Sequence, residues 1–329
     1  MTKDNQLIEV RGLCKSYGEV RAVDGIDFAV AEGELFGFLG PNGAGKTTTI
    51  EVLTGLGRSD SGTVRIGGID CSRNPKAAQH LMGIVPDESN LYPELSGRDN
   101  LEFCGSLYGM PAKEREARAG ELLDRFGLEY AAGRRFGGYS KGMKRKLTIA
   151  AGIVHSPPLL FLDEPTTGID VASARDIRRL LAELNGAGTT VFLTTHYIEE
   201  AERLCDRIAF IVGGRIVRTD TVDVLIEDAR HLHVVHITVD ARADELASTI
   251  SSRFGGVACV PESEREIRIE SSAPVSVGPI IRMIEEHGVE VYEARRLRPS
   301  LEEVFVRITG IESKMMNQEK ERQQPGGGA

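Results

Sequence analysis

The chain has 329 residues, which is long enough for two domains that each bury a core. Its net charge of −9 speaks against a broad basic surface for nucleic acid, and it contains no run of about 18 apolar residues that would span a bilayer. The five cysteines are scattered without a C-x-x-C pair, so neither a disulfide nor a zinc framework is expected. We therefore expect a cytoplasmic protein whose contact with any membrane runs through a separate polypeptide.

The longer, N-terminal part of the chain predicts an α/β domain, to which we assign residues 7–230. Residues 7–33 alternate apolar and polar side chains around turn residues, which predicts antiparallel strands. Strands then alternate with helices, a pattern typical of a largely parallel sheet, and a hairpin is expected over 208–218. Residues 92–153 hold amphipathic helical runs and no convincing strand, so we interpret them as a helical insertion.

The loop over residues 40–48 is the most informative stretch of the sequence. It matches G-x-x-x-x-G-K-[ST], follows an apolar strand at 35–39 and leads into a helix, which is the context of a phosphate-binding loop. In that context backbone N–H groups point at phosphate oxygens, Lys46 neutralises the β- and γ-phosphates, and Thr47 ligates Mg²⁺. The alternative is a glycine-rich turn that binds nothing, which the complete match and its flanks disfavour. We predict that a nucleoside triphosphate is bound by Gly40, Pro41, Asn42, Gly43, Ala44, Gly45, Lys46, Thr47 and Thr48.

A second apolar strand, at 159–162, ends in two carboxylates. Asp163 is placed to hold Mg²⁺ beside the phosphate loop, and Glu164 is placed to polarise an attacking water as general base. Taken alone, an Asp-Glu pair after a strand is also compatible with a helix cap. Together with the phosphate loop it indicates hydrolysis, because open α/β sheets bind ligands at the carboxyl ends of their strands.

Residues 231–310 predict a second, smaller domain. Strand and helix patterns follow in the order βαββαβ with a terminal helix, which fits a ferredoxin-like α+β fold. The role of this domain stays open, because a fold does not by itself give a function. Residues 311–329 end in Gln-Gln-Pro-Gly-Gly-Gly-Ala and predict a disordered tail.

The motifs occur in the order found in ATP-binding cassette (ABC) ATPases, and over residues 7–230 the chain resembles that family. A phosphate loop is shared with other nucleotide hydrolases. The segment Tyr139-Ser140-Lys141-Gly142-Met143 separates ABC proteins from them, and Gly168-Ile169-Asp170 and His196 complete the set. The resemblance implies a P-loop ABC domain with a mostly parallel sheet, an N-terminal antiparallel β layer and the helical insertion.

The resemblance also implies roles for single residues. Ser140 and Gly142 are expected to contact the γ-phosphate bound to an opposite subunit, and Asp170 to link the two sites across the dimer. The alternative for Ser140 is an ordinary helix N-cap. Tyr17 is expected to stack on adenine, its alternative being a strand-edge tyrosine. His196 is expected to contact the γ-phosphate and the attacking water, although a lone histidine is usually a satisfied polar residue.

One position departs from the family pattern. The family usually has Gln after the strand that precedes the helical insertion, and here Asp87 takes that place. A carboxylate still ligates Mg²⁺ or orders water, but it adds negative charge near the phosphates and donates no hydrogen bond when ionised. We keep Asp87 as a further candidate Mg²⁺ ligand beside Thr47 and Asp163.

The form Tyr-Ser-Lys-Gly-Met and the ending Ser-Leu-Glu-Glu-Val-Phe at 300–305 resemble the daunorubicin-type drug-resistance subgroup of ABC ATPases. This implies an ATPase that uses ATP and Mg²⁺ and works as a homodimer or with a paralogue. It would power a separate transmembrane permease, in export, from the inner face of the cell membrane. Two alternatives stay open: a non-transport ABC ATPase acting on translation or DNA, and a small-molecule kinase with an accessory domain. The cargo is left open, because the permease mainly selects it.

Overall fold

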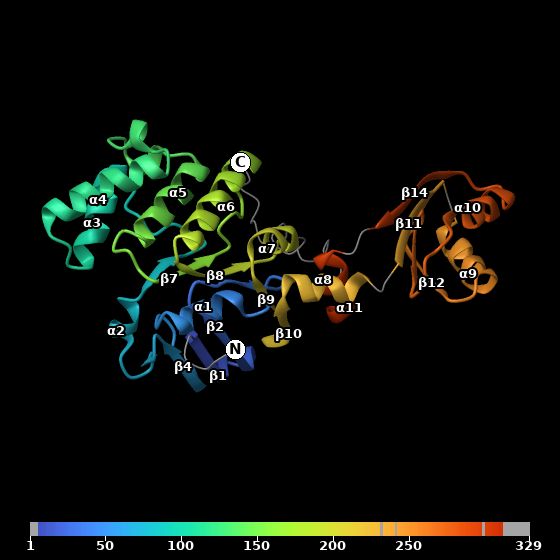
Figure 1. Cartoon of the computed structure of the whole chain (residues 1–329), viewed down its shortest axis with the longest axis horizontal. Helices are drawn as coiled ribbons and strands as arrows, with labels where there is room; N and C mark the ends of the chain where they lie inside the picture. The colour runs from blue at the N-terminus through green and yellow to red at the C-terminus, as the bar shows by residue number, and fades with distance from the viewer. Residues whose placement is uncertain (1–5, 231–232, 241, 298–299, 312–329) are drawn as a thin grey trace. The chain divides into compact units, whose positions relative to one another are not determined.

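The computed structural model describes residues 6–230, 233–240, 242–297 and 300–311, and it consists of two compact units (Figure 1). The first unit extends to Thr221 and the second covers Val222–Gly310. Helix α8 (Val222–Arg230) thus lies in the second unit, whereas the sequence analysis placed it at the end of the first domain. It packs against helix α11 (Leu301–Thr309), a relation that no local pattern shows. After residue 311 the predicted tail lies outside the described residues.

An antiparallel sheet begins the first unit. It contains the strands predicted within 7–33 and two more that the sequence analysis missed, in the order β2-β1-β4-β5. The missed signal is the alternation of residues 63–66 ahead of the turn Gly67-Gly68, which is typical of a hairpin. The strands are β1 (Gln6–Tyr17), β2 (Val20–Ala31), β4 (Ser61–Ile66) and β5 (Ile69–Asp70).

The central sheet is the largely parallel layer that the sequence predicts. Its order is β10-β9-β3-β8-β7-β6, and neighbouring strands are parallel except for the hairpin of β9 and β10. The register pairs Leu39 with Thr195 and Asp163 with Thr194, so the residues that follow these strands emerge at one edge of the sheet. The strands are β3 (Leu35–Leu39), β6 (Met82–Val85), β7 (Leu159–Asp163), β8 (Thr190–Thr195), β9 (Arg207–Val212) and β10 (Arg215–Thr221).

Helices cover both faces of the central sheet. Figure 1 shows α5 and α6 on one side of it, and α1 with the antiparallel sheet on the other. Residues 92–153 form helices and no named strand, as predicted for the helical insertion. Within the described ranges, no helix combines the length and apolarity needed to cross a membrane. The helices of this unit are α1 (Lys46–Leu53), α2 (Pro75–Gln79), α3 (Gly97–Leu107), α4 (Ala112–Arg125), α5 (Lys141–Gly152), α6 (Val171–Gly186) and α7 (Ile198–Leu204).

Aromatic rings fill the space between the two sheets of the first unit. Phe28 of β2 stacks on Phe36 of β3 with ring centroids 5.8 Å apart, and Phe192 of β8 lies 5.7 Å from Phe36. All three rings are buried, and the burial of large apolar side chains is the main stabilising contribution to such a core. The packed sheet gives the loops at its carboxyl edge a rigid base.

The second unit has the predicted ferredoxin-like strand order. Its 4-stranded sheet is antiparallel with the order β12-β13-β11-β14, so the first and third strands of the unit are central. Helices α9 and α10 bury their apolar faces against one side of this sheet. The elements are β11 (His233–Val239), α9 (Ala243–Arg253), β12 (Val257–Ser263), β13 (Glu266–Ser271), α10 (Val277–Glu286) and β14 (Val291–Leu297).

Candidate nucleotide site

A cavity of about 350 Å³ opens at the carboxyl edge of the central sheet. Its lining combines the predicted phosphate loop with residues that follow β6 and β7. These segments are far apart in the sequence, and the parallel register of the sheet brings them together. The lining residues are Ala22, Asn42, Gly43, Gly45, Lys46, Thr47, Thr48, Asp87 and Glu164.

Two glycines of the loop are required by the geometry of the backbone. Gly45 has φ +102°, and a Cβ there would lie 2.2 Å from the carbonyl oxygen of Ala22. A Cβ on Gly40 would lie 2.1 Å from the carbonyl oxygen of Ile211. Both distances are far inside van der Waals contact, so any side chain would displace the loop. The glycines therefore allow the backbone to curl tightly into the start of α1, a helix N-terminus of the kind that binds anions.

Lys46 is buried at the centre of the cavity wall. Its Nζ donates hydrogen bonds to the carbonyl oxygens of Gly40 at 2.7 Å and Pro41 at 3.1 Å, and lies 3.2 Å from Glu164 Oε1. The amide nitrogen Nδ2 of Asn42, also in the wall, is buried without a hydrogen-bond partner among the described residues. An orphaned buried donor is rare, and a phosphate oxygen would satisfy it. The wall thus fits a phosphate group.

Thr47 and Asp163 meet at the edge of the cavity as a candidate cation site. Thr47 Oγ1 donates to Asp163 Oδ2 at 2.8 Å, and Thr194 Oγ1 donates to Asp163 Oδ1 at 2.5 Å. A hydroxyl and a carboxylate are oxygen ligands of the kind that Mg²⁺ takes next to phosphates. The second hydroxyl holds the Asp163 carboxylate in one orientation. The donor set therefore fits the predicted Mg²⁺.

Glu164 occupies a constrained position between the loop and His196. Its backbone has φ +49°, a left-handed conformation that is uncommon for a residue with a side chain and is typical of functional sites. His196 Nδ1 lies 2.7 Å from Glu164 Oε2, and Thr167 Oγ1 donates to the same oxygen at 2.9 Å. Burial alone would raise the pKa of Glu164, but the hydrogen bond with His196 and the charge of Lys46 outweigh it and lower the pKa to about 2. Glu164 is therefore a carboxylate that faces the cavity in ionised form.

Arg145 is a residue of this site that the sequence analysis missed. It lies on α5 with only 6% of its surface exposed, and its guanidinium donates to the carbonyl oxygens of Pro86 at 2.5 Å and Glu164 at 2.8 Å. It also reaches Asp87 Oδ1 at 3.4 Å. The available signal was helical spacing, since Gly142, Arg145 and Ile149 fall on one face of α5, and that face is buried. Arg145 ties the segment after β6 to the segment after β7.

Comparison with known proteins places the chain in a family. The family model described as ABC transporter matches residues 23–167. The daunorubicin resistance ATP-binding protein DrrA2 of Streptomyces coeruleorubidus is 37% identical over 310 residues, which are 93% of this chain and 96% of that protein. The chain belongs to the ABC transporter ATP-binding family. This confirms the family that the motif order indicated.

Other relatives extend over the second unit of this ABC protein as well. The linearmycin resistance ATP-binding protein LnrL of Bacillus subtilis (strain 168) is 36% identical over 307 residues, or 92% of this chain and 98% of that one. The Nod factor export ATP-binding protein I of Paraburkholderia xenovorans (strain LB400) is 38% identical over 310 residues, or 93% of this chain and 97% of that one. Coverage of this extent includes both compact units.

Solved structures match the ABC fold of the first unit. An ATP-binding subunit of an ABC transporter is similar with a TM-score of 0.62 and 31% identity, and covers 68% of this chain and 92% of its own. A dimeric ATP-binding cassette bound to ADP and Pi in a post-hydrolysis state has a TM-score of 0.61 and 28% identity, with 65% of this chain and 98% of its own covered. The predicted P-loop ABC fold is confirmed.

The three ABC residues expected to act on a partner subunit lie together. Ser140 is the N-cap of α5, where its Oγ accepts a hydrogen bond from Met143 N at 3.2 Å, so the helix-cap alternative describes its contact within this chain. Asp170 is the N-cap of α6. The missing side chain of Gly142 lets the two helix starts approach closely. A Cβ there would lie 2.2 Å from Ser173 Oγ and 3.6 Å from Asp170 Oδ2. Among the described residues, none of the three lines the phosphate cavity of its own chain.

Tyr17, the expected adenine-stacking residue, lies at the end of β1 with 49% of its surface exposed. Its hydroxyl donates to Glu51 Oε2 at 3.2 Å, and the Lys15 ammonium lies 5.0 Å from its ring centroid. Tyr17 is not among the residues that line the phosphate cavity. Its stacking role stays a prediction.

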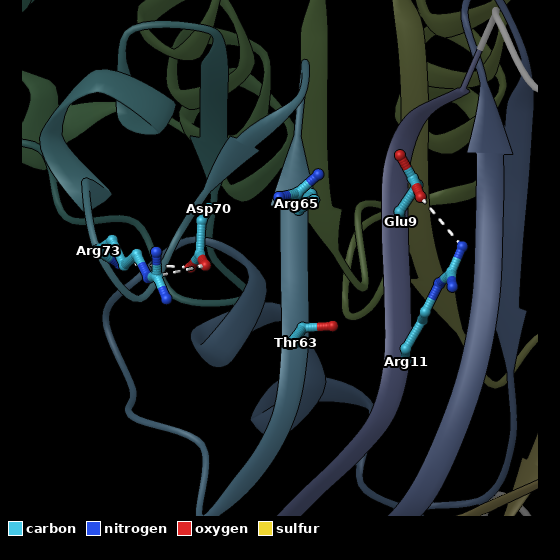
Figure 2. Close-up of a pocket in the computed structure, with 6 residues that line it drawn as sticks. All are labelled: Glu9, Arg11, Thr63, Arg65, Asp70 and Arg73. Carbon is cyan, nitrogen blue, oxygen red and sulfur yellow. Dashed lines mark hydrogen bonds and ion pairs between the residues drawn. The ribbon is translucent and has the colours of Figure 1, made fainter.

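Figure 2 shows a second hollow, of about 410 Å³, on the antiparallel sheet of the first unit. Its charges are arranged as cross-strand neighbours, with Arg65 opposite Glu9 on one side and Asp70 on the other. Arg11 lies 3.6 Å from Glu9, and Arg73 lies 3.6 Å from Asp70. Opposite charges in such pairs stabilise a solvated sheet surface. This hollow lacks a phosphate loop and is assigned no ligand.

One group in the second unit has the composition of a metal site. His236, Glu262 and Glu266 place possible ligand atoms within 4.8 Å of one another. The guanidinium of Arg268 already lies 3.8 Å from Glu262, and His236 Nε2 lies 3.0 Å from the same carboxylate. A cation is thus already present beside the carboxylate, and we interpret the group as a polar network.

Proposed function

We propose that this chain is the ATP-hydrolysing subunit of an ABC exporter. The observation that carries the proposal is the position of Glu164, which faces the phosphate cavity in contact with both Lys46 and His196. A carboxylate so placed is suited to hydrolysis and not to simple nucleotide storage. The export role is supported by the relatives, whose names describe drug resistance and Nod factor export and whose similarity covers both compact units.

The chemistry follows from what each side chain holds. The loop N–H groups and Lys46 bind the β- and γ-phosphates, and Lys46 then exchanges its carbonyl and Glu164 contacts for phosphate oxygens. Glu164 loses a positive neighbour in that exchange, which makes it a stronger base for the proton of the attacking water. His196 orients Glu164 and that water. Thr47 and Asp163 would hold Mg²⁺, which neutralises charge on the phosphate oxygens when it is bound.

Asp87 takes a different part from the usual Gln. Its ion pair with Arg145 balances the added negative charge, and Arg145 in turn holds the carbonyl oxygen of Glu164. We propose that Asp87 transmits the position of the loop at 86–91 to the catalytic carboxylate through Arg145. Its direct ligation of Mg²⁺ stays the weaker interpretation, because half-exposed Asp87 is already engaged by a guanidinium.

The active form would contain two copies of this chain or one copy with a paralogue. Ser140, Gly142 and Asp170 share one place at the starts of α5 and α6 and do not line the cavity of their own chain. A helix N-terminus favours an anion, which fits a γ-phosphate brought by the partner. The related dimeric cassette bound to ADP and Pi supports this arrangement.

The partner that spans the membrane would be a separate permease. An exposed aromatic pair lies beside the helical insertion, with Tyr92 and Phe103 in edge-to-face contact at 5.2 Å, and Leu107 farther along α3 is also exposed. Exposed apolar side chains that gather in this way mark a protein interface. We infer that the permease contacts this surface and holds the chain at the inner face of the cell membrane.

The first prediction concerns the catalytic carboxylate. Replacing Glu164 by Gln keeps the shape and removes the base, so phosphate release from Mg-ATP should fall by roughly 10²–10⁴-fold while ATP binding is retained. ATP that is bound and not hydrolysed should hold two copies together. Phosphate release and sedimentation velocity measure the two effects. A variant that stays monomeric with Mg-ATP and hydrolyses at the normal rate would contradict the proposal.

Native purification of the tagged chain from solubilised membranes tests the transport role. A multi-helix membrane protein in near-stoichiometric amount is expected. Ribosomes or nucleic acid in its place would favour the non-transport alternative and leave the ATPase chemistry intact.

A further inference from the structure

A second buried carboxylate lies behind the catalytic pair. Glu200 of α7 has 3% of its surface exposed. Among the described residues, no cation lies within ion-pair distance of it, and burial raises the pKa of its carboxyl. A buried carboxylate without a counter-ion costs several kcal/mol unless hydrogen bonds satisfy it. Such a group is uncommon in a core, and its contacts indicate what it does.

Both oxygens of Glu200 accept hydrogen bonds from threonine hydroxyls, one in the loop after β7 and one at the last residue of β8. Thr166 Oγ1 donates to Oε1 at 2.8 Å, and Thr195 Oγ1 donates to Oε2 at 3.0 Å. Thr195 Oγ1 accepts in turn from Tyr197 N at 3.0 Å, so one hydroxyl links Glu200 to the peptide unit that follows His196. Glu200 therefore joins the loop after β7 to the end of β8.

These contacts close a ring around the catalytic pair. On the cavity side, Glu164 bonds to His196 at 2.7 Å. On the buried side, Glu200 bonds to Thr166, which follows Glu164 by two positions, and to Thr195, which precedes His196. The backbone closes the ring, because it connects Glu164 to Thr166 and Thr195 to His196. With the ring closed, the two segments cannot separate without breaking a buried hydrogen bond.

The ring also explains how the strained backbone of Glu164 is maintained. A left-handed conformation in a residue with a side chain costs about 1–3 kcal/mol and persists only where the surroundings enforce it. Strand β7 holds the residue from one side, through Asp163. The bond from Thr166 to Glu200 holds it from the other. Without this bond, the segment after Glu164 loses one of the contacts that enforce its conformation, next to the bond from Arg145 to the Glu164 carbonyl oxygen.

We propose that Glu200 is a positioning residue for ATP hydrolysis, which bridges the hydroxyls of Thr166 and Thr195 and so keeps Glu164 and His196 in register. The inference rests on the proposed ATPase function. Glu200 is buried and is not among the residues that line the phosphate cavity. Its effect is on the geometry of the base, and a shift of about 1 Å in a reacting group costs up to about 10²-fold in rate.

The test uses the full-length chain in single-turnover hydrolysis of Mg-ATP, with nucleotide affinity measured by a fluorescent ADP analogue. Glu200→Ala opens the ring and should lower kcat by roughly 10–100-fold, with affinity changed by less than about 3-fold. Glu200→Gln keeps an acceptor for one hydroxyl and an amide that donates to the other, so it should restore most of the rate. Glu199→Ala is the matched control, because its side chain on the same helix is 85% exposed.

Isosteric changes guard against a folding defect. Thr195→Val and Thr166→Val remove the hydroxyls without changing shape much, and each should reproduce part of the loss in kcat. Combined with Glu200→Ala, Thr166→Val should add nothing further, since its bond to Glu200 is already lost, whereas Thr195→Val also removes the acceptor of Tyr197 N. Thermal denaturation of each variant shows whether it is folded at the assay temperature.

The outcomes separate this inference from the function on which it rests. If Glu200→Ala and the two valine variants hydrolyse at the rate of Glu199→Ala, the inference is wrong and the ATPase proposal stands. The inference is also wrong if Glu200→Gln is as slow as Glu200→Ala. If the unchanged chain hydrolyses no ATP, both the proposed function and this inference are overturned.

Discussion

Two residues of the nucleotide site, Arg145 and Asp87, form one ion pair but differ in their contribution to the free energy of unfolding. Arg145 is buried and donates to two main-chain carbonyl oxygens, whereas the Asp87 side chain is 43% exposed. Removing a partner from a buried carbonyl costs about 1–3 kcal/mol, while an exposed ion pair contributes about 0–1 kcal/mol. The stabilising contribution of the pair therefore comes from the bonds that Arg145 makes to the backbone.

Arg145→Ala should accordingly lower the free energy of unfolding by about 1–3 kcal/mol for each carbonyl that loses its donor. Asp87→Ala should change it by less than about 1 kcal/mol. Urea denaturation of the two variants at equal ionic strength measures both values. Equal losses in the two variants would show that the ion pair, and not the carbonyl contacts, is what stabilises the site.

The buried carboxyl of Glu200 gives a prediction on pH. Burial raises its pKa above the ordinary value of 4.5, so its ionised form is disfavoured in the folded chain. Its contribution to stability is therefore fully present below about pH 4.5 and is lost as the pH rises through the folded pKa. Five charged or titratable groups interact electrostatically with the Glu200 carboxyl: Arg145, Glu164, Arg178, Tyr197 and Cys205.

Glu200→Gln removes this titration and nothing else that ionises. The unfolding free energy of the unchanged chain, minus that of the variant, should fall as the pH is raised from about 4 to about 8. Urea denaturation at a series of pH values measures the difference. A difference that is flat or rises with pH would show that Glu200 is not disfavoured as an anion.

At the scale of elements, the starts of α5 and α6 are packed against each other without room for a side chain. A Cβ on Gly142 would lie 2.2 Å from Ser173 Oγ and 2.7 Å from Ser173 Cβ. Gly120, in the middle of α4, has only the guanidinium end of Arg98 near its missing Cβ, at 3.9 Å. A side chain at Gly142 would therefore collide with the neighbouring helix, whereas a methyl group at Gly120 has room.

Gly142→Ala should destabilise the chain by about 1–3 kcal/mol, because the packed helix start must shift to admit the methyl group. Gly120→Ala should stabilise it by about 0.5–1 kcal/mol, since alanine is the better helix former. Chemical denaturation compares the two, and Ser173→Gly in the Gly142→Ala background should recover part of the loss. Stabilisation by both alanines would mean that the two helix starts are not in contact.

At the scale of the whole molecule, the boundary between the compact units falls before α8 and not after it. Leu225 of this helix is fully buried, and α8 packs against α11 at the other end of the second unit in sequence. An amphipathic helix without its partner exposes its apolar face to water. Where the chain is cut therefore decides whether the first unit stays monomeric on its own.

A chain that ends at Thr221 should remain monomeric without nucleotide and bind ATP as the full chain does. A chain that ends at Arg230 carries α8 without α11 and should aggregate or lose residues 222–230 to proteases. Size-exclusion chromatography and limited proteolysis distinguish the two. If only the longer chain folds, α8 belongs to the first unit in solution.

Local patterns determined much of what is described for this protein. The phosphate loop, the Asp163-Glu164 pair and the order of strands and helices along the second unit follow from neighbouring residues, whose spacing reflects a turn or a strand end. These features depend on backbone geometry over a few positions. They were therefore predictable before any contact between distant segments was known.

The tertiary structure decided the rest, because the relevant partners are far apart in the chain. Arg145 acquires its role from carbonyl oxygens that lie 59 and 19 positions away, and Glu200 from a hydroxyl 34 positions away. The pairing of β4 with β1 and of α8 with α11 is of the same kind. A basic or acidic residue on a helix looks solvent-exposed in the sequence, and only the fold shows that its charge is buried and what it holds in place.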